Sequence, residues 1–117
     1  MSRTIHARAP NDLRKAAKAV VARYSTAPSH ETETALAVLA LWALDAIEAD
    51  WLTPQEANSI FVLLDIGIGD RPGPELSDQV QQLVLEGEHF HHHGEEWGPD
   101  ADQLRALAFA ILLRVGE

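Results

Sequence analysis

The longest apolar stretch of the chain covers residues 35–47, where only Asp45 interrupts a run of alanine, leucine, valine, isoleucine and tryptophan. Alanine and leucine favour the α-helix, and apolar residues would occupy nearly every side of it. Either protein or lipid must surround such a helix. The run is shorter than the ~20 residues that span a bilayer, which favours protein. We therefore predict a buried core helix over residues 30–51. Its buried stripe should comprise Leu36, Ala40, Ala43 and Ile47, widened by Leu39, Trp42 and Ala46, and its most solvated line Thr34, Leu41, Asp45 and Glu48.

Four further segments place apolar residues at the spacing of an amphipathic helix. The sharpest start signal is Thr53-Pro54-Gln55-Glu56, where Thr53 fits the N-cap, Pro54 the first helical position and Glu56 the capping box. Ser29 is the predicted N-cap of the central helix, and Gly87 should stop the fourth helix. We predict these helices from Pro10 or Asn11 to Tyr24, from Pro54 to about Asp65–Gly67, from Glu75 or Ser77 to Glu86, and from Pro99-Asp100 onward.

These segments predict an all-α fold, a compact bundle of about five helices around the central buried helix at approximately residues 30–51. No segment alternates apolar and polar residues with period two, so no sheet is expected. Residues 1–9 lack a clean period and should form a flexible N-terminal arm. Residues 10–117 then form a single helical domain.

Charge is distributed unevenly along the chain, whose net charge is −9. Residues 1–30 carry six basic residues against one acid, a net of +5, whereas residues 31–117 carry three against 17, a net of −14. The basic first helix could be an interaction arm, or it could lie against its own acidic body. Nucleic acid is disfavoured as a partner, because few basic residues and no exposed aromatic platform stand on that helix.

The chain has no cysteine, which excludes disulfides and thiolate metal sites. That composition fits a reducing compartment, and no apolar segment of a secretory signal follows the N-terminus. We therefore expect a cytoplasmic protein that does not associate with a membrane.

The segment over residues 86–96 is rich in histidine and glutamate. Imidazole and carboxylate are ligands for transition metals, so the segment is a candidate site for zinc, nickel or iron. The candidate metal ligands are Glu88, His89, His91, His92 and His93. A di-metal bundle site would need a second Glu-x-x-His motif on another helix, and the chain has none. The alternative is a solvated polar connector that Phe90 and Trp97 anchor, which needs no cofactor; the histidines could also sense pH.

Other motifs do not assemble into a catalytic site. Gly67-Ile68-Gly69 follows a helix rather than a strand, so it lacks the context of a nucleotide-binding loop. The five serines, Ser2, Ser25, Ser29, Ser59 and Ser77, lie in start, cap or helix positions and show no arrangement typical of a catalytic triad, which argues against nucleophilic catalysis and against an enzyme.

Negative charge and the missing catalytic motif together favour a small acidic helical protein that acts through protein–protein contacts. It could be an adaptor, an inhibitor or an immunity-type partner of a basic surface. The last helix carries apolar residues beyond its core stripe, which also predicts a homodimer or other homo-oligomer. The candidate interface residues are Phe109, Leu112, Leu113 and Trp51. The alternative function is metal binding by residues 86–96.

Overall fold

The computed structural model describes residues 2–89 and 101–116, with side-chain surroundings for residues 11–89 and 101–116. The described residues form five helices and no strand, which confirms the all-α prediction. The helices are α1 (Ser2–Arg23), α2 (Ser29–Glu48), α3 (Pro54–Gly69), α4 (Asp78–Glu88) and α5 (Ala101–Val115). None of them combines the length and apolar character that crossing a membrane requires.

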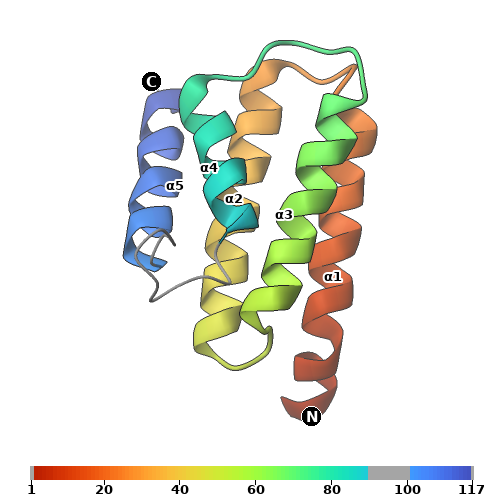
Figure 1. Cartoon of the computed structure of the whole chain (residues 1–117), viewed down its shortest axis with the longest axis vertical. Helices are drawn as coiled ribbons and strands as arrows, with labels where there is room; N and C mark the ends of the chain where they lie inside the picture. Colours follow the sequence, from red (N-terminus) through yellow and green to blue (C-terminus); the bar gives the residue numbers. More distant parts are fainter. Residues whose placement is uncertain (1, 90–100, 117) are drawn as a thin grey trace.

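The helices form two layers, as Figure 1 shows: α5, α2 and α1 lie side by side, and α4 and α3 pack across them. Within its layer α2 lies between α1 and α5, and its opposite contacts are with α4 and, to a lesser extent, α3. The core between the layers receives large, fully buried side chains from every helix. These are Leu13, Leu36, Leu64, Val80, Leu83, Leu104 and Ile111.

The predicted buried stripe of α2 is confirmed except at Trp42, which is exposed, and at Ile47, which is half-buried. Leu36, Ala40 and Ala43 are buried, but Trp42 is 39% exposed and Val38 is 48% exposed. Because α2 belongs to an outer layer, the second layer covers only one side of it. The side turned away from α3 and α4 is left without a covering helix in the described part of the chain.

A buried carboxylate, Glu33, joins α2 to both α4 and α5. Its oxygens accept hydrogen bonds from the backbone N–H of Ser77 at 2.7 Å and from Arg114 at 2.5 Å. Ser77 is the N-cap of α4, and Arg114 lies in the last turn of α5. The negative charge therefore faces a helix N-terminus, and the positive charge lies near a helix C-terminus, as the helix dipoles favour.

Burial alone would raise the pKa of Glu33, but the hydrogen bond from Ser77 and the charge of Arg114 outweigh it and lower the pKa below 4.5. Arg114 also donates to the hydroxyl oxygen of Ser77 at 2.8 Å and to the side-chain oxygen of Gln79 at 2.8 Å. The network is satisfied on every side, so it fixes how three helices meet.

The ends of α2 and α3 show how local sequence sets the helix boundaries. The predicted capping box is confirmed: Glu56 N–H donates to the Thr53 hydroxyl oxygen at 3.1 Å, and Thr53 N–H donates to the Glu56 carboxylate at 2.9 Å. The prediction of Ser29 as N-cap is wrong, because α2 already begins there and Pro28 holds the cap position without a side-chain hydrogen bond.

After α2 the chain turns through Asp50, whose φ of 61° is left-handed. Trp51 N–H donates to the carbonyl of Ala46 at 2.8 Å, and Asp50 N–H to that of Ile47 at 3.1 Å. This is the Schellman pattern, which usually places glycine at the left-handed position.

Other boundaries also differ from the prediction. α2 ends at Glu48 rather than at residue 51, since the chain turns through the left-handed Asp50. α1 begins at Ser2 rather than at Pro10 or Asn11. Pro10 has the character of a first helical residue, but it lies inside the helix. The flexibility of residues 1–9 stays a prediction. α3 continues to Gly69, beyond Asp65–Gly67. Gly87 does not stop α4 but is buried inside it. The ring of Phe61 packs so closely there that it leaves no room for a Cβ. The predicted start of the last helix at Pro99-Asp100 lies outside the described residues.

We predict that Arg114→Ala lowers the free energy of unfolding at pH 7 by about 1.5–3 kcal/mol, because it leaves the buried Glu33 carboxylate with one charged partner fewer. The control, Arg105→Ala, removes an arginine from two exposed acids and should cost about 0.5 kcal/mol. Glu33 has a lowered pKa, so its contribution is present above about pH 4.5 and is lost as pH falls through its folded-state pKa. Urea unfolding at pH 7 and pH 3 would measure both effects, and equal losses for the two variants would contradict the role of Glu33.

We predict that Asp50→Gly raises the free energy of unfolding by about 0.5 kcal/mol, since glycine adopts the left-handed conformation without a Cβ penalty. Asp50→Ala removes the same charge but keeps the Cβ, so it should lower the stability by about 1 kcal/mol. Thermal unfolding of the two variants separates the backbone effect from the charge effect, because a charge effect would move both in one direction.

Candidate interaction surface

A groove runs along the uncovered side of α2, where that helix meets α1. Val38 and Trp42 lie one turn apart on α2 and form its exposed wall, and Ala16 and Val20 of α1 face them. The hollow has a volume of about 450 Å³. Its other lining residues are His30, Glu31, Thr34, Ala35 and Leu39.

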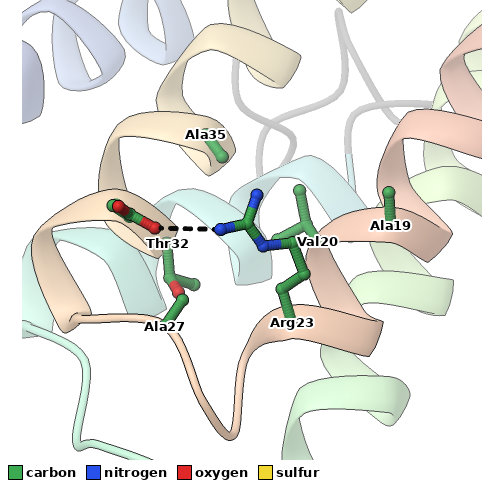
Figure 2. Close-up of a pocket in the computed structure, with 7 residues that line it drawn as sticks. Ala19, Val20, Arg23, Ala27, Thr32 and Ala35 are labelled. Carbon is green, nitrogen blue, oxygen red and sulfur yellow. Dashed lines mark hydrogen bonds and ion pairs between the residues drawn. The ribbon is translucent and has the colours of Figure 1, made fainter.

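The groove continues toward the loop between α1 and α2. A smaller hollow of about 160 Å³ shares Val20, Glu31 and Ala35 with it, so the two are continuous. Figure 2 shows Arg23 reaching from α1 across this hollow, and its guanidinium lies 3.5 Å from the carboxylate of Glu31. We call the two hollows together the open groove. From Glu31 to Trp42 it follows α2 for about 16 Å, at 1.5 Å per residue.

The edge of α5 extends the same apolar face on the other side of α2. Arg105 donates to Asp45 at 2.9 Å and to Glu48 at 2.6 Å, while Arg114 reaches Glu33, so α5 runs antiparallel to α2. Phe109 lies one turn after Arg105 on the same edge and is 50% exposed. The register therefore places Phe109 alongside the exposed line of α2.

Exposed hydrophobic side chains gather on this face. Seven large hydrophobic residues are exposed in the described part of the chain, and four of them lie on α2 and α5. The four are Val38, Trp42, Phe109 and Leu113. Scattered exposed leucines are ordinary, but a contiguous apolar patch with a polar rim is typical of a contact surface.

The rim of this face is acidic. Glu31, Asp45 and Glu48 lie on α2, and helical spacing places Asp12 on the edge of Ala16 and Asp102 on the edge of Arg105. By the same spacing Lys15 lies on the edge of Ala19. The five acids therefore stand against three bases, Lys15, Arg23 and Arg105, and the described residues of the face carry a net charge of −2.

The predicted interface residues divide into two groups. Phe109 and Leu113 are exposed on α5, as an interface requires, although no described contact tests that role. Leu112 and Trp51 are half-buried and pack against the core. The sequence reasoning missed Val38 and assigned Trp42 to the core. Their four-residue spacing beside Asp45 was the available signal, since an acid on a helix marks the side that faces water.

The predicted metal ligands are only partly described, because His91, His92 and His93 lie outside the described residues. The two described candidates, Glu88 and His89, interact with other protein groups. The side chain of Glu88 is hydrogen-bonded to Asp65 of α3, and its carbonyl accepts from the side-chain amide of Asn58. The Nδ1 atom of His89 lies 2.9 Å from the carbonyl oxygen of Leu85. Within residues 2–89 and 101–116, no group of three or more potential ligands is placed to hold a metal ion.

The contact between Glu88 and Asp65 brings two carboxyl groups together where α3 meets α4. Burial and the hydrogen bond and charge of Asp65 raise the pKa of Glu88 from 4.5 to about 7. The carboxyl group of Glu88 therefore keeps its proton to a higher pH than an ordinary glutamate does.

We predict that the stability of the protein falls as pH rises from about 4.5 to about 7, and that Glu88→Gln removes this fall. A raised folded-state pKa gives stability that is full below the unfolded-state pKa and is lost as pH rises through the folded-state value. At pH 8 the variant should be more stable than the wild type by about 1 kcal/mol, a figure that allows for partial exposure. Denaturant unfolding from pH 4 to pH 8 measures this, with Glu86→Gln as the charge-matched control. An unchanged pH slope in Glu88→Gln would contradict it.

No protein-family model, curated protein or solved structure matches the chain.

Proposed function

We propose that the protein works by binding another protein, and that its open groove docks a basic amphipathic helix of the partner. The observation that carries this proposal is the exposure of Val38 and Trp42 in the middle of the longest apolar run of the chain. An exposed tryptophan beside a hollow is a common anchor of a protein interface.

The shape of the groove supports a helix as its occupant. It lies between two packed helices, and its length of about 16 Å accommodates about three turns of a third helix. A partner helix would place apolar residues at i, i+4 and i+7, the pattern of a helix that binds in a groove. Residues on its flank would then contact Phe109 across α2.

The charge of the rim supports a basic partner rather than a second copy of the chain. Two copies docked through this face would bring together two surfaces of −2 each, whereas lysine or arginine on a partner helix would meet Glu31 and Asp45. The net charge of −9 would also speed the encounter with a basic partner at low salt.

The test uses a designed helical peptide with leucine at i, i+4 and i+7 and lysine on its flanks, together with a second peptide in which glutamate replaces lysine. We predict that the lysine peptide binds, that the glutamate peptide binds at least tenfold more weakly, and that Val38→Ser/Trp42→Ser weakens the lysine peptide at least tenfold. Fluorescence anisotropy with labelled peptides measures the affinities. The control, Val62→Ser/Leu85→Ser, removes two exposed hydrophobic residues from α3 and α4 and should leave binding unchanged.

Several outcomes would overturn the proposal. Equal binding of both peptides would remove the charge argument, and equal weakening by the control variant would remove the groove. Light scattering that shows a dimer which Val38→Ser/Trp42→Ser dissociates would make a second copy of the chain the occupant. Thermal unfolding of each variant confirms that a loss of binding does not reflect a loss of fold.

A further inference from the structure

A second groove lies on the opposite side of α1, between α1 and α3. It has a volume of about 470 Å³, and its lining residues are Lys18, Val21, Leu63, Ile66, Gly67 and Arg71. None of them lines the open groove, which takes Ala16 and Val20 from α1. The two grooves are therefore separate surfaces, and what binds one does not depend on what binds the other.

The floor of this second groove is apolar. Val21 is buried at its base, Leu63 is half-buried and Ile66 is 57% exposed. The two helices approach closely there because Gly67 has no side chain, and a Cβ at that position would lie 2.7 Å from a methyl group of Val21. The result is a trough with one large hydrophobic side chain, that of Ile66, facing water.

The rim of the second groove is basic. Lys18 stands on α1 and Arg71 follows α3, both are exposed, and no acid is among the described residues that line the groove. Neither cation forms a salt bridge with a described acid. Two unneutralised cations beside an apolar floor favour a ligand with one negative end and one apolar end.

The dimensions indicate a small ligand rather than a peptide helix. From Leu63 to the end of α3 at Gly69 the groove follows the helix for about 9 Å, which is less than two turns. Its volume lies in the range of small-molecule sites, about 300–1,000 Å³. We infer that this groove binds a single-chain amphiphilic anion, with its carboxylate at Lys18 and Arg71 and its alkyl chain along Val21, Leu63 and Ile66.

The test is a titration of the ¹⁵N-labelled protein with decanoate below its micelle concentration, followed by amide chemical shifts. We predict saturable shifts centred on the six lining residues. Decanol, which lacks the charge, and decyltrimethylammonium, which reverses it, should bind at least tenfold more weakly. Lys18→Ser/Arg71→Ser should weaken decanoate at least tenfold, whereas Lys15→Ser/Arg23→Ser, which removes two charges from outside the groove, should leave the affinity within twofold.

The inference is overturned if decanoate shifts no amide of the groove, if decanol binds as tightly, or if the two double variants behave alike. It is also overturned if the protein ignores monomeric decanoate but binds vesicles that contain an anionic phospholipid, since the surface would then recognise a membrane. Ile66→Ser tests the contact with the alkyl chain separately from the contact with the carboxylate. It should weaken decanoate binding while leaving the unfolding temperature close to that of the wild type, because this side chain is exposed.

Discussion

The apolar surface of α2 is the constraint on which the rest of the structure depends. Hydrophobic residues occupy nearly all sides of this helix, so the remaining four helices must cover as much of it as their length allows. α1 and α5 cover its two flanks and α4 its inner side. Two layers cannot enclose a helix that belongs to one of them, and the line through Val38 and Trp42 is the part that stays open. The candidate interaction surface is thus a consequence of the architecture.

Polar contacts decide how the helices meet around that apolar surface. Hydrophobic burial has no direction, and a bundle of amphipathic helices could pack in several registers. Glu33 restricts the choice, because its carboxylate needs both the N-terminus of α4 and the guanidinium of Arg114. On the outer side, Arg105 fixes α5 against the far end of α2 through Asp45 and Glu48. The two arginines lie on opposite edges of α5 and set its register from both sides.

The sequence was sufficient for the fold class and for most helix positions, since apolar spacing and the signal at Thr53 depend on nearby residues. It was insufficient wherever a distant partner decides the outcome. Gly87 resembles a helix terminator, but the ring of Phe61 gives it a packing role inside α4. Trp42 resembles a core residue, and only the arrangement of layers leaves it exposed. The second groove could not be predicted because Lys18 and Arg71 are far apart in the chain.

The partnership of Glu33 with Arg114 has a consequence for the order of events during synthesis. The two residues are separated by 81 positions, so the carboxylate is made long before the guanidinium that it needs. Contacts between residues this distant form late, and a nascent α2 that buried Glu33 early would leave a carboxylate without its cation. We therefore expect the part of α2 around Glu33 to pack firmly only after α5 has been translated and has brought Arg114 to it.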